Sequence, residues 1–226
     1  SYTALQVGGV GAIAGETSAS AGSATRYTNN VYLNSGGSWA YQVTDEASMY
    51  QQKNGAHTFQ VASSGTADAA ISWNTAMTID NAGIVTKPYQ PAFLYQGANG
   101  QNNIAINTEN TILFTTGRFD NNNDFGSNVF TAPVNGRYQL NTHLRIDAWD
   151  AQATYYQLYL RTSNRTYYQT FAGPAASTDL NYFTMNLSIL ADMELGDTAR
   201  VIIYQGNGTQ QSDIHGESSF SGFLVC

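Results

Sequence analysis

The 226-residue chain contains one cysteine, Cys226, at its last position. A single cysteine cannot form an intrachain disulfide, so a disulfide framework is excluded. Charged residues make up 11% of the chain, well below the roughly 25% usual for soluble domains. The formal net charge is −7, from 9 Lys and Arg against 16 Asp and Glu. So few cations are poorly suited to neutralising phosphates, and neither nucleic acid nor anionic lipid is expected as a partner.

The sequence also lacks an apolar run of about 18 residues, so no membrane insertion is predicted. No signal peptide is visible at the N-terminus, and no segment keeps a 3.6-residue period. Aromatic residues, by contrast, reach 12%, with 15 Tyr. Short alternating segments separated by turn residues predict an all-β protein. A surface poor in charge and rich in Tyr and Asn is typical of extracellular or virion β-proteins.

The clearest strand lies within residues 130–146, FTAPVNGRYQLNTHLRI. From Tyr138 to Ile146, apolar residues and Thr142 alternate with polar ones, among them His143. Side chains of a strand point to opposite faces with period two, so this pattern predicts a half-buried antiparallel strand.

Three motifs carry a resemblance to a known family. They are FTAPVNGRY at 130–138, LGD at 195–197 followed by RVII at 200–203, and SFSGFLV at 219–225. In this order they resemble C1q-like jelly-roll domains, over roughly residues 91–226. The resemblance implies a C-terminal jelly-roll β-sandwich whose protomers pack as a homotrimer.

The residues before this region predict a separate part of the chain. Residues 1–30 are rich in Gly, Ala and Ser, which suits either a flexible linker or the end of a fibrous shaft. Residues 31–88 show short strands and turns, although 44–50 could form one helical turn. Their few large apolar residues make a poor independent core, so oligomerisation is expected. Prolines 88 and 91 mark the boundary between a shaft or collar region, 1–88, and a tip domain, 89–226.

The first region also resembles bacteriophage tail fibres, especially those of marine bacteria. The similar segments are YQQKNGAHTF at 50–59, SGTA at 64–67 and AMTIDNAGIV at 76–85. This resemblance implies an extracellular tail fibre that is part of the virion. Its expected partners are other phage tail proteins and a bacterial cell-surface receptor, which is either a glycan or an outer-membrane protein.

Candidate ligand residues are expected in loops, which vary without disturbing a scaffold. Three loops are nominated: 147–152, 163–165 and 206–215. Within them, the candidate ligand-binding residues are Asp147, Trp149, Asp150, Asn164, Arg165, Asn207, Asp213 and His215.

Catalysis is not predicted. Asp147 and Asp150 flank Trp149, a plausible sugar platform, and a glycosidase needs two carboxylates around one bond. Acids in turns, however, ordinarily hydrogen-bond their own backbone, and this interpretation is favoured. No catalytic residue is therefore assigned.

Asp120, Asn122 and Asp124 offer oxygen ligands at alternate positions, which suits calcium. The segment departs from an EF-hand loop, because Phe125 stands where Gly is needed and Thr131 where Glu is needed. The alternative is an Asx-rich loop held by its own hydrogen bonds. No other cofactor is expected.

Surplus aromatics suggest an interface. Tyr155 and Tyr159 fall on the strand face opposite Tyr156, so both faces of that strand carry large groups. A sandwich buries only one face, and the other is predicted to meet a partner. Tyr155, Tyr159, Tyr167 and His143 are the candidate trimer-interface residues. Alternatives are a ligand surface or ordinary core filling.

The function expected from these features is a non-catalytic trimeric adhesin of a phage tail fibre that attaches to a bacterial surface. Alternatives are a structural trimerisation cap, a secreted C1q-like recognition domain, and a polysaccharide depolymerase.

Overall fold

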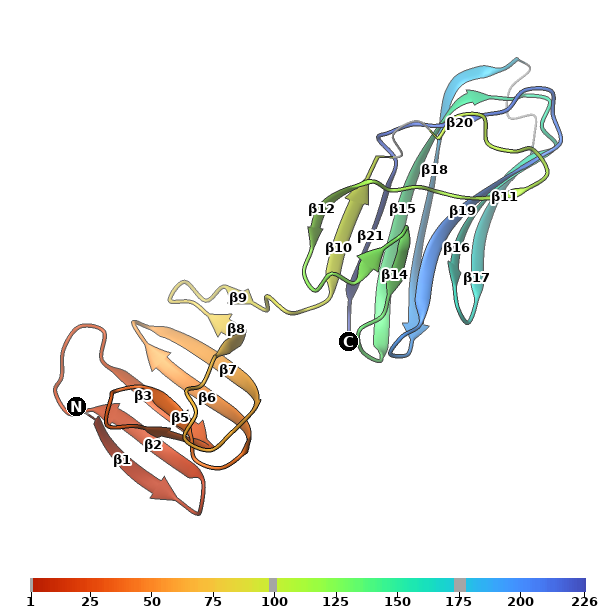
Figure 1. The fold of residues 1–226 in the computed structure, drawn as a ribbon. Helices are drawn as coiled ribbons and strands as arrows, with labels where there is room; N and C mark the ends of the chain where they lie inside the picture. The colour runs from red at the N-terminus through yellow and green to blue at the C-terminus, as the bar shows by residue number, and fades with distance from the viewer. Residues whose placement is uncertain (1, 98–100, 173–177) are drawn as a thin grey trace. The chain divides into compact units, whose positions relative to one another are not determined.

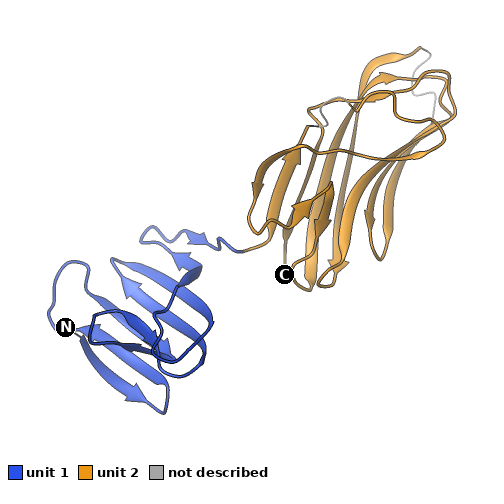
Figure 2. Ribbon diagram, in the orientation of Figure 1, with its two compact units in different colours: residues 1–89 blue, residues 90–226 orange. Residues whose placement is uncertain are grey.

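The computed structural model describes residues 2–97, 101–172 and 178–226, and every regular element in them is a β-strand (Figure 1). The all-β class predicted from alternation and turns is therefore confirmed. The chain divides into two compact units, Ser1–Tyr89 and Gln90–Cys226 (Figure 2). They are called unit 1 and unit 2 below.

Unit 1 is built on one seven-stranded antiparallel sheet. Its strands, in spatial order, are β1 (Tyr2–Val7), β2 (Gly11–Glu16), β3 (Ala24–Asn29), β6 (Asp45–Lys53), β7 (Ala56–Gly65), β8 (Asn74–Ile79) and β9 (Val85–Thr86). The hairpin of β4 (Val31–Leu33) and β5 (Trp39–Tyr41) packs on one face of this sheet. There Val31 and Tyr41 bury Ala47 of β6 and Ala62 of β7 in a small core.

Two expectations for unit 1 are corrected. Residues 2–29 form three paired strands, so a flexible linker is the wrong alternative for this segment. Residues 45–50 belong to β6 and form no helical turn. In both segments cross-strand pairing satisfies the backbone groups, and local propensity alone did not reveal the partner strands.

Unit 2 contains two sheets that enclose one core. The first has the order β12 (Thr116–Asp120), β10 (Ala92–Gln96), β21 (Ser219–Leu224), β15 (Gly136–Trp149) and β18 (Leu180–Met193), with β20 (Asp213–Ile214) also paired to β15. The second has the order β13 (Phe125–Gly126), β14 (Val129–Thr131), β19 (Thr198–Gly206), β16 (Tyr155–Thr162) and β17 (Thr166–Ala172), with β11 (Glu109–Thr111) also paired to β19.

The core of unit 2 lies between the inner faces of these sheets. Phe93 stacks on Phe130 at 4.7 Å between ring centroids, and Phe220 meets Phe93 edge-on at 5.1 Å. Along β15, Tyr138, Leu140, Leu144 and Ile146 are fully buried. This confirms the half-buried strand predicted from alternation. Each such side chain contributes about 1.5–3 kcal/mol relative to leaving it in water.

Candidate ligand site and assembly face

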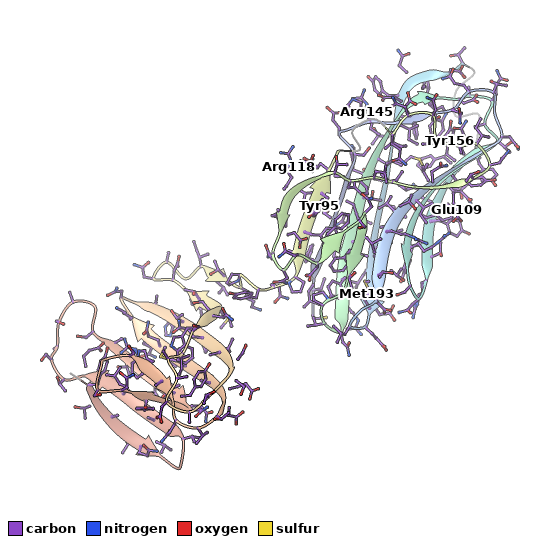
Figure 3. All side chains as sticks on the ribbon, in the orientation of Figure 1. Tyr95, Glu109, Arg118, Arg145, Tyr156 and Met193 are labelled. Atoms are coloured by element: carbon purple, nitrogen blue, oxygen red, sulfur yellow. The ribbon has the colours of Figure 1, made fainter. Side chains whose placement is uncertain are left out.

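Unit 2 has two distinct ends. The chain enters at Gln90, whose Nε2 donates to the carbonyl of Leu224, and it finishes at Cys226, whose carbonyl accepts the Arg137 N–H. We call this the proximal end. The opposite, distal end carries the loops after β15 and β19 (Figure 1). In Figure 3, Met193 lies at the proximal end and Arg145 toward the distal end.

The distal loops are held together by Asp150, which is 1% exposed. Its carboxylate accepts backbone N–H groups from Gln152 at 2.7 Å, Thr209 at 2.6 Å and Gln210 at 2.8 Å. Burial acts to raise the pKa of Asp150, but these hydrogen bonds outweigh it and lower the pKa. Asp150 therefore braces two loops from within, and its prediction as a ligand contact is wrong.

The other distal residues connect further loops. Asp213 accepts the N–H of Asn103 at 2.6 Å, which ties the segment before β11 to β20. Asn207 is exposed; its N–H donates to Asn107 Oδ1 at 2.8 Å, and its side chain donates to Thr154 Oγ1 at 3.0 Å. The distal surface is thus a built structure in which loops distant in sequence are hydrogen-bonded to one another.

Trp149 does not reach this surface. It is fully buried and stacks on Tyr156 at 3.8 Å and against Phe183 at 4.5 Å. Strict alternation along β15 would place it outward with Asp147, but Ala148 has a φ of 53° and the alternation breaks there. The prediction of Trp149 as a sugar platform is wrong, and the indole is a core residue.

Asn164 and Arg165 are not at the distal end either. They form the turn between β16 and β17, at the proximal end. Asn164 Nδ2 donates to Asp197, and Arg165 forms an ion pair with Asp192 at 2.9 Å. The three nominated loops were expected to share one end of the sandwich, and this expectation is wrong for 163–165.

A charged cluster lies where β15 approaches the distal end. Arg145 donates through Nε to Asp147 and through Nη1 to Glu217, both at 2.9 Å, and these contacts raise the pKa of Arg145. His215 Nδ1 lies 3.7 Å from Glu217 Oε2. The guanidinium also lies 5.0 Å from the ring centroid of Tyr182, which is 63% exposed. We call these five residues the distal cluster.

Two of the five, Asp147 and His215, were nominated from sequence, whereas Arg145, Glu217 and Tyr182 were missed. A polar hollow of about 370 Å³ adjoins the cluster through Glu217. It is also lined by Gln96, Gly97, Thr116, Arg118 and Gly216. Arg118 is exposed and donates to Gln96 at 2.6 Å (Figure 3). One exposed cation, a carboxylate and an exposed aromatic ring suit a polar ligand such as a sugar.

The two acids that flank Trp149 do not form a catalytic pair. Asp150 is enclosed and accepts loop N–H groups, whereas Asp147 is ion-paired to Arg145 on the outward face. A glycosidase needs both carboxyl groups on opposite sides of one accessible bond. These two acids therefore carry structural hydrogen bonds, as turn acids ordinarily do.

The Asp120–Asp124 segment is organised by its own hydrogen bonds. The Asp120 carboxylate accepts the N–H groups of Asp124 at 2.9 Å and Phe125 at 3.0 Å, and Asn122 Nδ2 donates to Asp124 at 3.3 Å. Burial raises the pKa of Asp124. Among the residues that the structure describes, no three His, Cys, Asp or Glu side chains gather at metal-binding distance. Calcium at Asp120, Asn122 and Asp124 stays a prediction.

The outward face of the first sheet is uncharged over its centre. Gln139 donates to Ser188 at 2.8 Å, Ser188 donates to Asn141 at 2.7 Å, and His143 pairs with Asn186 at 2.9 Å. The same sheet also carries exposed apolar groups: Phe119, Leu190 and Phe223, each about half exposed. We call this surface of β10, β12, β15, β18 and β21 the assembly face. It contains His143, one of the predicted interface residues.

The three predicted interface tyrosines lie on the second sheet. Tyr155 stacks on Tyr204 at 5.7 Å, and the Tyr159 hydroxyl donates to Gln157. Tyr167 packs against the hydrophobic core, so it mainly fills the core, which was the alternative to an interface role. In a cyclic trimer, one surface patch of each protomer contacts a different patch on its neighbour. Tyr155 and Tyr159 therefore stay candidate interface residues, on a surface separate from His143.

Two antiparallel sheets around one core, with non-consecutive strands as neighbours, define the class of jelly-roll β-sandwiches. The model of one family, described as the C1q domain, matches residues 92–225. The match covers more than half of the chain, and the chain belongs to the C1q domain family. Domains of this family serve recognition and trimerisation, typically form trimers and are generally non-catalytic.

Two solved structures are similar to part of this chain. The globular domain of zebrafish complement 1qA protein is 19% identical, with a TM-score of 0.48, over 61% of this chain and 98% of that one. Murine APRIL at pH 8.0 is 8% identical, with a TM-score of 0.45, over 60% of this chain and 99% of that one. No curated protein sequence matches the chain. Within the described residues there is no helix long and apolar enough to cross a membrane.

Proposed function

We propose that this chain is a non-catalytic receptor-binding component of a bacteriophage tail fibre, assembled from three copies. One observation carries the binding role: the polypeptide enters unit 2 at the proximal end, while the braced loops and the distal cluster occupy the other end. Such a domain can be anchored at one end and bind at the other. Unit 1 then serves as shaft or collar, and unit 2 is the tip.

The virion assignment is supported by the tail-fibre-like segments between residues 50 and 85 and by the low content of charged residues. The trimer is supported by membership of the C1q domain family. In this proposal other phage tail proteins hold the fibre, and the receptor is a bacterial surface glycan or outer-membrane protein.

The distal cluster and the hollow beside it supply the contacts. Arg118 can donate to carboxylate or hydroxyl groups of a ligand, and Tyr182 offers an exposed ring. Three copies on one fibre bind together, so weak contacts at single sites combine into strong avidity.

The test is binding of the fluorescently labelled chain to a panel of marine bacterial strains. Arg118→Ala with Tyr182→Ala should reduce cell binding at least tenfold, because both side chains are exposed at the distal end. Arg165→Ala, an exposed cation at the proximal end, is the matched control and should bind normally. Equal binding by all variants contradicts the proposed site. A trimer that binds none of the strains or their purified surface polysaccharides favours the trimerisation-cap alternative.

A further inference from the structure

The sheet of unit 1 has one covered face and one open face. The hairpin of β4 and β5 packs over the covered face, where Arg26 and Glu16 form a largely buried ion pair. On the open face, one row of directly paired residues crosses six strands. This row, which we call the apolar ladder, runs Leu5, Ile13, Tyr27, Tyr50, Phe59 and Met77.

Every position of the apolar ladder carries a large apolar or aromatic side chain. Tyr50 stacks on Phe59 at 4.8 Å and lies 5.8 Å from Tyr27. Leu5 is nevertheless 65% exposed, Tyr27 47% and Phe59 37%. A shallow hollow of about 510 Å³ lies over the ladder, lined by Ile13, Tyr27, Tyr50 and Phe59 together with Val7 and Val61 of the neighbouring row.

The rows on either side of the ladder add no charge. One row pairs Val7, Gly11, Asn29, Ser48, Val61 and Asn74, and the other pairs Thr3, Gly15, Thr25, Gln52, His57 and Ile79. None of these residues is Asp, Glu, Lys or Arg, in a chain whose net charge is −7. An exposed row of large apolar side chains bordered by uncharged residues marks an interaction surface, because soluble monomers rarely expose large apolar patches.

We infer that the apolar ladder packs against the ladders of the other two copies of this chain, so that three copies of unit 1 share a core of their own. This inference rests on the trimer in the proposed function. It goes beyond the C1q domain, because the family match begins at residue 92 and the ladder lies wholly within unit 1.

Copies of the same chain are the occupant that the observations favour. Only five residues, 87–91, separate β9 from β10, so a trimer of unit 2 brings three copies of unit 1 together. Tethers this short give effective concentrations in the millimolar range. A face without charge can meet its own copies without repulsion, although each chain is acidic overall. An acidic or basic partner would find no complementary charge there.

The dimensions fit a three-fold arrangement. Neighbouring strands lie about 4.8 Å apart, so six strands span about 24 Å. If three faces of that width form the sides of a triangle, the middle of each face lies about 7 Å from the common axis. Two packed sheets are usually about 10 Å apart, so each lies only ~5 Å from the plane midway between them. The extra distance needs long side chains in the middle of each face. Tyr27 and Tyr50 occupy the two middle positions of the ladder.

Thiol cross-linking of the full chain with a short bis-maleimide tests this directly, because the linker can span the gap that the long side chains fill. In a Cys226→Ser background, Tyr27→Cys places a thiol at the middle of the ladder, and Ile84→Cys places one on a turn of the same unit that is 60% exposed. Mass is measured by sedimentation before the bis-maleimide is added, and cross-linked dimer is measured on denaturing gels. We expect a trimer for both variants and at least tenfold more dimer for Tyr27→Cys.

A second pair of variants keeps the test valid if a cysteine disturbs the open face. Phe59→Lys should keep the trimer mass but lose amide hydrogen-exchange protection in β3, β6 and β7, whereas Ile84→Lys should keep both. The inference is overturned if the chain is a trimer but both cysteine variants cross-link equally and Phe59→Lys keeps its hydrogen-exchange protection. That result leaves the proposed function standing. A monomeric unmodified chain overturns both.

Discussion

Arg145 on β15 donates to the carboxylate of Glu217 at 2.9 Å, across 72 residues of sequence. The same guanidinium donates to Asp147 and lies over the ring of Tyr182. The contact joins the distal end of a central strand to the loop before β21. It also fixes one wall of the hollow that contains Arg118.

This ion pair should contribute little to stability and more to binding. Glu217 is largely exposed, and exposed pairs are worth about 0.2–1 kcal/mol. A double-mutant cycle of Arg145→Ala and Glu217→Ala, followed by chemical denaturation, should give a coupling free energy in that range. Arg145→Ala should weaken cell binding at least fivefold. A coupling free energy above about 3 kcal/mol would show instead that the pair is a buried structural element.

Trp149 should behave as a core residue and not as a ligand contact. Trp149→Ala should lower the free energy of unfolding of unit 2 by about 3–5 kcal/mol, because it leaves a cavity against Tyr156 and Phe183. Trp149→Phe should cost less and keep cell binding. Tyr182→Ala, at an exposed aromatic, is the control and should change the unfolding free energy by about 0.5 kcal/mol or less. A Trp149→Phe variant that folds normally but cannot bind cells would restore Trp149 to the ligand site.

Unit 1 should lose stability in acid through Glu16. The N–H of Ala24 and then the guanidinium of Arg26 hold the pKa of Glu16 at about 2. Because folding lowers this pKa, the ionised carboxylate stabilises the folded state. Its full contribution to the free energy of unfolding is present above the unfolded pKa of 4.5 and is lost as pH falls toward 2. Glu16→Gln should flatten this acid limb in thermal unfolding of unit 1. An unchanged acid limb in Glu16→Gln would contradict the assignment.

In unit 2, local alternation predicted the central strand correctly as far as Ile146. The alternation from Tyr138 to Ile146 matches the burial of β15, because one face of that strand meets the core throughout. The pattern failed at Trp149, where the positive φ of Ala148 reverses the alternation. Alanine rarely adopts that conformation, so nothing in the sequence marked the position.

The candidate site depended on tertiary pairing. Arg145 and Glu217 meet only because β20 and β21 both pair with β15, and no local motif specifies that register. The misplacement of Asn164 and Arg165 was avoidable, because successive antiparallel strands place their turns at alternate ends. In unit 1 the apolar ladder depends on the register of six strands, which single-segment patterns do not give.

The central claim, assembly of three copies, is tested most directly by the solution mass of the intact chain. Sedimentation at micromolar concentration, with and without a calcium chelator, should give a single species of three times 24.4 kDa. Loss of that species in the chelator would make the Asp120–Asp124 segment the leading metal site. A species of 24.4 kDa in both conditions would contradict the account, because the assembly face and the apolar ladder would then both be open to solvent.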